Sequence, residues 1–418
     1  MASDDVGITG FDPVSAVNPH VRSLTTSLIR RFDREVSPIP GILKLTLGEP
    51  DFDTPEFIKR SAGDSLRRNR THYAPNAGTE GLREAISSYL SRRRGLSYPR
   101  EDIVVTEGAS EAISSVLTAL LHPGAILLYA TPGFGLYRSM ADIMGASPRP
   151  IDTTGTGFAL TAEDLDHALG EAAGHDTVLV LNSPSNPTGV TLNEKRLKEL
   201  AEVIESHDVI VVSDEVYAEI SYETRPAPSI ARFAPDRTVL VDSASKSFAM
   251  TGWRIGYFAA PHELSSQLAK VHQTHVATAA TFVMDAAQTA YEQGDAAIDD
   301  MVRQYRERRD YLLGAFTDLG LRTARPTGAF YLYVAVPDGF PGSGLDYARH
   351  LAREARVAAI PGEAFVDGPS RDVRFSYAAG IDTLHEAVRR MTPVVAKDLR
   401  GQGDVGIPYT PSRTGAGQ

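Results

Sequence analysis

Residues 177–217, TVLVLNSPSNPTGVTLNEKRLKELAEVIESHDVIVVSDEVY, carry the clearest indication of the fold class. They contain two short apolar runs, TVLVLNSP and VIVVSDEVY, and between them a segment in which Leu, Ile and Val recur at helical spacing. Strands that are apolar on both faces are typical of a parallel sheet covered by helices on both sides. The stretch therefore predicts a strand, a helix and a second strand parallel to the first.

The same alternation extends along the chain toward both ends. Further apolar runs are IVVTEG at 103–108, ILLYATP at 126–132 and TVLVDSAS at 238–245, and the first is followed by the helical segment ASEAISSVLTALL. We therefore expect an α/β fold whose large domain, residues 51–290, is built on a mainly parallel sheet.

A smaller α+β domain is predicted after it. The charged helical stretch AIDDMVRQYRERRDYLLGAFTDLG is long enough to bridge two domains, and GAFYLYVAV, LDYARHLAREARVAAI and VRFSYA follow it within residues 291–398. We expect residues 1–50 to complete this small domain. Residues 399–418 are rich in Gly, Pro, Ser and Thr, which predicts a flexible tail.

The composition argues against several kinds of partner and chemistry. The 418 residues carry a net charge of -11, which argues against nucleic acid or an anionic membrane surface as a partner. No uncharged apolar run is long enough to span a membrane, and the start is not a signal peptide, so we expect a cytoplasmic protein. The absence of cysteine excludes disulfides and thiolate chemistry. The runs RRNR at 67–70 and RRR at 92–94 are interpreted as solvated helix faces.

Polar residues cluster where the predicted strands end. In doubly wound sheets, ligands bind at the carboxyl ends of the strands. One strand is followed by a glycine turn at which a helix begins. The N–H groups in the first turn of this helix are suited to binding a phosphate. The residues at these strand ends are Gly108, Ala109, Ser110, Asn186, Asp214, Tyr217, Ser243, Ser245, Lys246 and, shortly afterwards, Arg254.

Their chemistry fits one ligand. A lysine amine forms a Schiff base with an aldehyde, a carboxylate keeps a pyridine nitrogen protonated, and Asn and Tyr donate hydrogen bonds to a phenolate oxygen. Serines, helix N–H groups and an arginine bind a phosphate. Together these groups predict pyridoxal phosphate as the cofactor.

The chain resembles the class I aminotransferases of pyridoxal-phosphate fold type I. The resemblance is carried, in this order, by LGEPDF, YAPNAG, NPTG, DEVY, SASK with GWRIGY, GAFY and RFSYA. The segments TEGASEAI, TTGTGFALTAEDL and SPSNPTGVTL are similar to the bacterial aminotransferase A branch. The resemblance implies a homodimer that moves an amino group between an L-amino acid and a 2-oxo acid by a ping-pong route, with 2-oxoglutarate as the expected acceptor.

The resemblance also implies residue roles around the cofactor. Lys246 would form the Schiff base and then move the proton, Asp214 would pair with the pyridine nitrogen, and Tyr217 and Asn186 would bind the ring 3-oxygen. Phe134 would stack on the ring. The phosphate would be held by Gly108, Ala109, Ser110, Ser243, Ser245 and Arg254, with Tyr73 reaching across from a second subunit.

For the substrate, Arg374 would bind the α-carboxylate through its planar fork, with Asn186 and the backbone of Gly48 beside it. Ser110 stands where some dicarboxylate-specific relatives carry lysine. The group that binds a distal carboxylate is therefore unassigned.

Three alternatives stay open. A pyridoxal-phosphate β-lyase, or another biosynthetic enzyme on this scaffold, would have a similar core but would release ammonia and pyruvate. A non-catalytic sensor of the cofactor would need a DNA-binding domain, for which the residues before LGEPDF are too few. A metal site at His272 and His275, in HQTH, lacks a third ligand, so we expect a pair on a helix surface and no metal.

Overall fold

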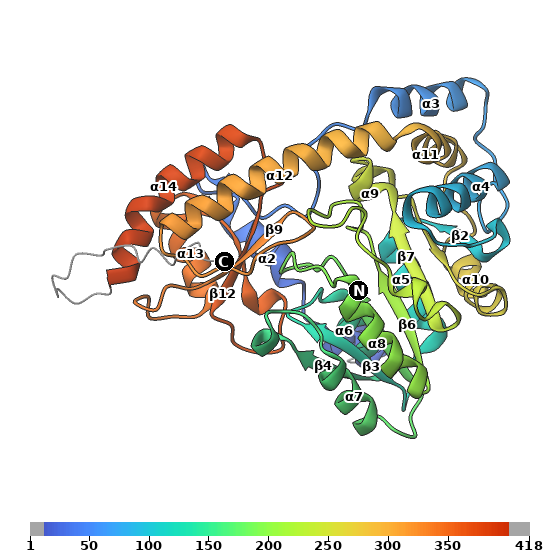
Figure 1. The fold of residues 1–418 in the computed structure, drawn as a ribbon, viewed down its shortest axis with the longest axis horizontal. Coiled ribbons are helices and arrows are strands. Elements are labelled where there is room, and N and C mark those ends of the chain that lie inside the picture. The colour runs from blue at the N-terminus through green and yellow to red at the C-terminus, as the bar shows by residue number, and fades with distance from the viewer. Residues whose placement is uncertain (1–11, 401–418) are drawn as a thin grey trace, which may run out of the picture.

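The computed structural model describes residues 12–400, so the segments 1–11 and 401–418, with most of the predicted tail, lie outside the described residues. A seven-stranded sheet forms the larger part of the molecule (Figure 1). The neighbours β4, β3, β5, β6 and β7 are parallel, whereas β8 is antiparallel to β7 and β2. The predicted α/β fold with a mainly parallel sheet is confirmed. The strand order is β2 (Ile103–Thr106), β8 (Gly256–Ala259), β7 (Thr238–Ser243), β6 (Val209–Asp214), β5 (Thr177–Asn182), β3 (Ile126–Thr131) and β4 (Ser147–Asp152).

Helices cover both faces of this sheet, as the apolar strands require. In β5, Val178 and Val180 point to one apolar cluster, whereas Leu179 and Leu181 point to another on the opposite face. The first face is covered by α5 (Ala109–Leu120), α6 (Leu136–Met144) and α10 (His262–Val276). The second is covered by α7 (Ala162–Glu171), α8 (Glu194–Ser206), α4 (Glu80–Tyr89) and α11 (Thr281–Gln293), with α3 (Glu56–Arg67) packed on α11.

Two strands of the sheet are not among the predicted ones. The strand β4 has the sequence SPRPID, in which only Ile151 is buried, so it lacks the apolar run that identifies its neighbours. It pairs only with β3, at the edge of the sheet, where the missing N–H groups of Pro148 and Pro150 are tolerated. The other, β8, lies within the motif GWRIGYFAA.

The second part of the molecule is reached through the long helix α12 (Asp295–Asp318), which runs across the top of Figure 1. This second part contains an antiparallel sheet of β11 (Ile360–Pro361), β12 (Asp372–Ser376) and β9 (Tyr331–Ala335). A separate parallel pair joins β1 (Leu43–Lys44) to β10 (Val357–Ala358), so an early segment of the chain pairs with a late one. The domain boundaries at residues 50, 290 and 398 stay a prediction. The helices here are α2 (Leu28–Val36), α13 (Gly344–Glu354) and α14 (Ile381–Arg400); α1 (Pro19–Ser23) lies against α6, and α9 (Ala244–Ser247) follows β7.

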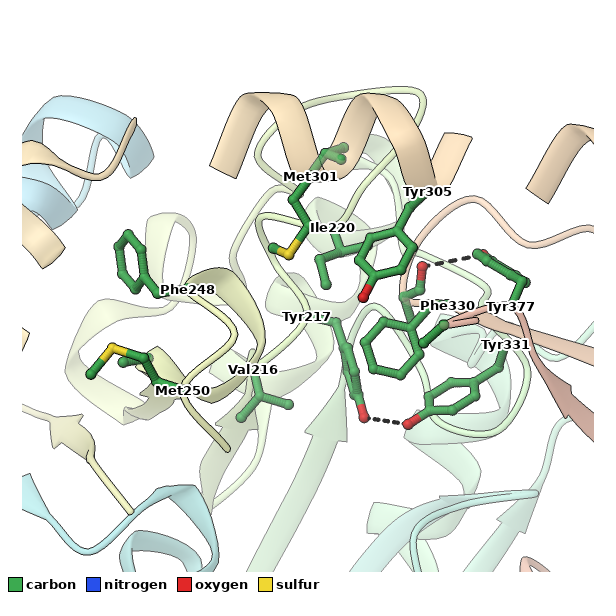
Figure 2. Close-up of a cluster of buried hydrophobic side chains, with 14 of the residues drawn as sticks. Val216, Tyr217, Ile220, Phe248, Met250, Met301, Tyr305, Phe330, Tyr331 and Tyr377 are labelled. Carbon is green, nitrogen blue, oxygen red and sulfur yellow. Dashed lines mark hydrogen bonds between the residues drawn. The ribbon is translucent and has the colours of Figure 1, made fainter. Parts of the chain in front are cut away.

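Aromatic side chains pack the two parts together. Tyr217, which follows β6, makes edge-to-face contacts with Phe330 and with Tyr331 of β9. Tyr305 of α12 packs on Phe330 (Figure 2). The cluster therefore fixes the end of a central strand against the second part of the molecule.

Two predictions about charged residues need correction. Arg94 was expected on a solvated face, but its side chain is only 1% exposed because it pairs with buried carboxylates. His272 was expected on a helix surface, but it is fully buried with its ring nitrogens near Glu111 and the Asn76 carbonyl. No metal-binding group of three or more ligands occurs within residues 12–400, and no helix there is long and apolar enough to cross a membrane.

Candidate active site

A cavity of about 270 Å³ lies at the carboxyl ends of the parallel strands and is lined by residues from both parts of the molecule. Parallel strands that end at one edge bring their following residues together, which explains why residues far apart in sequence meet here. All the predicted site residues except Gly108 and Tyr73 line it: Gly48, Ala109, Ser110, Phe134, Asn186, Asp214, Tyr217, Ser243, Ser245, Lys246, Arg254 and Arg374.

One end of the cavity is suited to an anion. Gly108 precedes α5 with a φ of 80°, and the first N–H groups of this helix have no partner within it. The guanidinium of Arg254 lies so close to Gly108 that a Cβ atom there would collide with it. Gly256 has a similar role, because a Cβ atom on it would lie 2.7 Å from the Ala109 nitrogen. Helix N–H groups and a guanidinium thus converge at this end.

Asp214, the last residue of β6, supplies a buried carboxylate. Its Oδ2 accepts a hydrogen bond of 2.6 Å from the Tyr137 hydroxyl of α6, and its Oδ1 accepts one of 3.4 Å from the Val216 nitrogen. Burial raises the pKa of Asp214 to about 6, although both hydrogen bonds oppose the shift. A positive charge beside this carboxylate would favour its ionised form.

Lys246 enters the same cavity from α9. Its amine donates a hydrogen bond to the Gly48 carbonyl. Burial lowers the pKa of Lys246 to about 8, and the cations Arg254 and Arg374 lower it further, against the attraction of Glu49. With a pKa of about 8, roughly a tenth of this amine is neutral at pH 7, and the neutral form suits both nucleophilic attack and proton transfer.

Arg374 of β12 is the cation at the opposite end of the cavity. It is 2% exposed, donates to Asn186 Oδ1 at 2.7 Å and to the Thr46 carbonyl at 2.9 Å, and lies over the rings of Tyr331 and Phe365. Its Nε is buried without a hydrogen-bond partner among the described residues. A guanidinium held in this way can donate hydrogen bonds to a planar carboxylate.

Two aromatic residues complete the walls. The hydroxyl groups of Tyr217 and Tyr331 lie 2.7 Å apart and form a hydrogen bond (Figure 2). Tyr217 is thereby connected to the ring over which the Arg374 guanidinium lies. Phe134 is half-buried in the cavity wall and makes an edge contact with Tyr137.

Tyr73 differs from the other predicted site residues. Its side chain is 92% exposed and does not line the cavity of its own chain. Beside Arg254 lies an open hollow of about 740 Å³ with apolar lining from Trp253, Phe282 and Val283. Both features lie on the surface rather than inside the chain.

Several residues that line the cavity have no role predicted from the sequence. Tyr331 ends the motif GAFY and Thr251 directly precedes GWRIGY, so the motifs indicate their positions but not their contacts. Tyr137 and Ile29 lie in helices, and nothing distinguishes them in sequence from ordinary core residues. The cavity residues without a predicted role are Ile29, Thr46, Ile113, Tyr137, Asn182, Val216, Thr251 and Tyr331.

Residues 40–391 match the family of class I and II aminotransferases. The chain belongs to this family. This aminotransferase is 38% identical to the probable N-acetyl-LL-diaminopimelate aminotransferase of Bacillus subtilis, over 91% of this chain and 96% of that protein. It is 35% identical to the aspartate aminotransferase of Pyrococcus abyssi, over 92% and 97%. The solved aspartate aminotransferase of Thermus thermophilus with maleate superposes with a TM-score of 0.85 at 34% identity, covering 90% of this chain and 99% of that one.

This aminotransferase is therefore an enzyme of fold type I that depends on pyridoxal phosphate. The residues in the cavity fit that cofactor. An anion-binding end, a buried carboxylate and a partly neutral amine match a phosphate, a pyridine nitrogen and an aldehyde respectively. The unpartnered Nε of Arg374 leaves a further donor for a substrate carboxylate.

Proposed function

We propose that Lys246, Asp214 and Arg374 carry amino transfer between an L-α-amino acid and a 2-oxo acid. The observation on which this rests is that a partly neutral amine, a buried carboxylate and a buried guanidinium line one cavity. When bound, the cofactor supplies a carbonyl carbon that takes the amino group and a protonated ring that withdraws electrons.

In this proposal, different groups of the protein bind the ring nitrogen, the ring oxygen, the ring face and the phosphate of the cofactor. Asp214 stays ionised beside the ring nitrogen, and Asn186 and Tyr217 donate to the ring oxygen. Phe134 covers one face of the ring. The phosphate is bound by the backbone and side chains of Gly108, Ala109, Ser110, Ser243, Ser245 and Arg254.

Lys246 is the proposed base. Its Nζ, when neutral, takes the proton from the substrate Cα and returns it at the neighbouring cofactor carbon. The lowered pKa supports this role, because an ordinary lysine amine would be almost fully protonated at neutral pH. The hydrogen bond to the Gly48 carbonyl holds the amine at the substrate end of the cavity.

Arg374 is the proposed anchor for the α-carboxylate. Because both half-reactions use one cavity, every donor and acceptor then carries a free α-carboxylate. We further propose 2-oxoglutarate as an acceptor, which is supported by relatives named for aspartate, another dicarboxylate. Asn186 accepts a hydrogen bond from the Arg374 guanidinium, and the Gly48 carbonyl accepts one from the Lys246 amine. Both residues would therefore contact the same substrate.

We propose that the enzyme works as a homodimer in the cytoplasm. A strongly exposed Tyr73 and an apolar hollow beside Arg254 support a partner subunit at this face. In such a dimer Tyr73 would reach the phosphate of the neighbouring site. A chain without cysteine suits a reducing compartment.

Arg374→Lys tests the proposed function, with each half-reaction followed separately in single turnover. The substitution keeps the charge but loses the planar fork, so kcat/KM should fall about tenfold to a hundredfold in both directions. An effect on the donor half alone, or equal reactivity of amines that lack a carboxylate, would contradict the role of Arg374.

A further inference from the structure

Arg94 is a fully buried cation that has no place in the chemistry described above. It ends a π-helical turn, Leu90–Arg94, and Gly95 then stops the helix with a φ of 61°. Its guanidinium contacts two carboxylates, Glu215 through Nη2 and Asp242 through Nη1 at 3.4 Å. Burying a guanidinium between two carboxylates is costly unless the geometry is held by further hydrogen bonds.

The two carboxylates are placed beside site residues. Glu215 directly follows Asp214 at the end of β6, and Asp242 directly precedes Ser243 at the end of β7. Asp214 reaches toward Tyr137 on the face covered by α6, whereas Glu215 and Asp242 reach Arg94. Because side chains alternate along a strand, a contact on one face sets the position of the neighbouring side chain on the other.

Both carboxylates are held by other donors as well. Glu215 Oε1 accepts hydrogen bonds of 2.6 Å from the hydroxyl groups of Ser213 and Ser229. Asp242 Oδ1 accepts one of 2.6 Å from the Ser243 nitrogen. The Arg94 guanidinium thus joins the side-chain clusters of Glu215 and Asp242, beside the backbone hydrogen bond of 2.9 Å that the Glu215 nitrogen donates to the Val241 carbonyl.

The hydroxyl of Tyr257 in β8 also donates to Asp242 Oδ2, at 3.4 Å. Asp242 is paired with Tyr257 across the β7 and β8 ladder. The cluster around Arg94 therefore contacts the ends of β6 and β7 and the start of β8, which lie next to the cavity residues Asp214, Lys246 and Arg254.

We propose that Arg94 is a positioning residue for amino transfer. By joining Glu215 to Asp242 it adds a side-chain link to the backbone pairing at the ends of β6 and β7, and so holds Asp214 and the segment Ser243–Lys246 in place on the opposite face. The inference rests on the proposed roles of Asp214, Ser243 and Lys246. Arg94 acts through these residues and touches neither substrate nor cofactor.

The test compares Arg94→Lys with Arg93→Lys in the holoenzyme. Lysine at 94 leaves the buried carboxylates a counter-ion but cannot bridge both of them with a planar fork. Arg93 is the matched control, because its guanidinium pairs with Glu219 and Asp299 and does not contact either strand-end carboxylate.

For Arg94→Lys we expect the pyridoxal phosphate dissociation constant to rise about tenfold and the maximal single-turnover rate to fall about tenfold, the change that 1.4 kcal/mol produces. The substrate concentration giving half the maximal rate should change less than twofold, because Arg374 is untouched. Arg93→Lys should change thermal stability but neither cofactor affinity nor maximal rate. If Arg94→Lys alters stability alone, as the control does, the inference is wrong.

A second variant decides the matter if Arg94→Lys does not fold. The neutral triple variant Arg94→Met, Glu215→Gln, Asp242→Asn removes the bridge without leaving an unpaired buried charge. Reduced cofactor affinity and maximal rate in it support the inference, and normal values overturn it. Asp214→Asn and Lys246→Ala are measured in parallel: if they retain normal rates, the proposed function has failed, whereas their loss beside an unaffected Arg94→Lys refutes the positioning role alone.

Discussion

Burial favours the neutral forms of both Lys246 and Asp214, so their pKa values shift in opposite directions. The pKa of the lysine is lowered to about 8, and that of the aspartate is raised to about 6. Both groups face one cavity, so the protein holds a base and an acid that change charge close to neutral pH. Each shift leads to a separate measurement.

Competitive acetylation of the apoenzyme should detect the lowered pKa of Lys246. Only the neutral amine reacts, so labelling of Lys246 should rise with pH to a midpoint near 8, read by mass spectrometry of its peptide. Lys59 is the internal control, because its hydrogen bond to Glu56 raises the pKa of this exposed amine. Parallel profiles for the two lysines would contradict the assignment.

Asp214→Asn should separate stability from activity. The folded-state pKa of Asp214 lies above its ordinary value, so its contribution to stability is present at low pH and is lost as pH rises through about 6. At pH 8 the apoenzyme with asparagine should therefore be more stable than wild type, by about 1–3 kcal/mol.

The gain should shrink at pH 5, where the wild-type carboxyl is largely protonated, and urea unfolding at both pH values measures it. Transamination should fall roughly a hundredfold or more, since the ring nitrogen loses its ionic partner. If the variant apoenzyme is less stable than the wild type at pH 8, the buried carboxylate does not destabilise the folded state.

At the level of elements, the apolar strands and their following polar residues could be predicted because parallel strands obey two simple rules. They are apolar on both faces, and their carboxyl ends meet at one edge. Asn186 and Lys246 follow such strands and Asp214 ends one, so their meeting was predictable. The strand β4 was not, since an edge strand containing Pro148 and Pro150 carries no apolar pattern.

Contacts between elements were harder to predict than the elements. Tyr137 lies in α6, which packs on α5, β3 and β4, and only its long side chain reaches Asp214 at the end of β6. Arg94 follows two other arginines, and nothing in that run reveals a π-helical turn that directs the third one inward. Such contacts depend on packing distances, which one sequence does not contain.

Gly256→Ala should test how closely β8 approaches the anion-binding end. A Cβ atom there would lie 2.7 Å from the Ala109 nitrogen, so the start of α5 must move. We expect cofactor affinity to fall about tenfold, a cost of about 1.4 kcal/mol, measured by fluorescence titration of the apoenzyme. Gly155→Ala is the control, because nothing lies within 4 Å of the atom it adds. Equal affinities in the two variants would contradict the prediction.

For the whole molecule, mixing two impaired proteins should reveal composite sites. Lys246→Ala lacks the base, and Tyr73→Ala lacks the residue proposed to serve the neighbouring subunit. Half of randomly formed dimers are hybrids, and each hybrid has one intact site of two, so about a quarter of wild-type activity should return after unfolding and refolding the mixture.

Sedimentation of the wild-type enzyme gives the independent control. A fully active monomer, or a refolded mixture no more active than its components, would contradict the composite site. The oligomeric state itself could not be derived from the pattern of strands and helices, because it depends on surface residues such as Tyr73 that have no periodicity.

The pairing of β1 with β10 also sets an order of events during synthesis. Leu43 and Lys44 leave the ribosome roughly 300 residues before Val357 and Ala358, their partners in the parallel pair. At about 5–20 residues per second, the early segment waits roughly 15–60 s for its partner strand. Throughout that interval the apolar residues Phe32, Val36 and Leu45, buried in the finished protein, lack part of the core that covers them. Until Val357 and Ala358 are made, the newborn chain therefore exposes apolar surface of the kind that promotes aggregation.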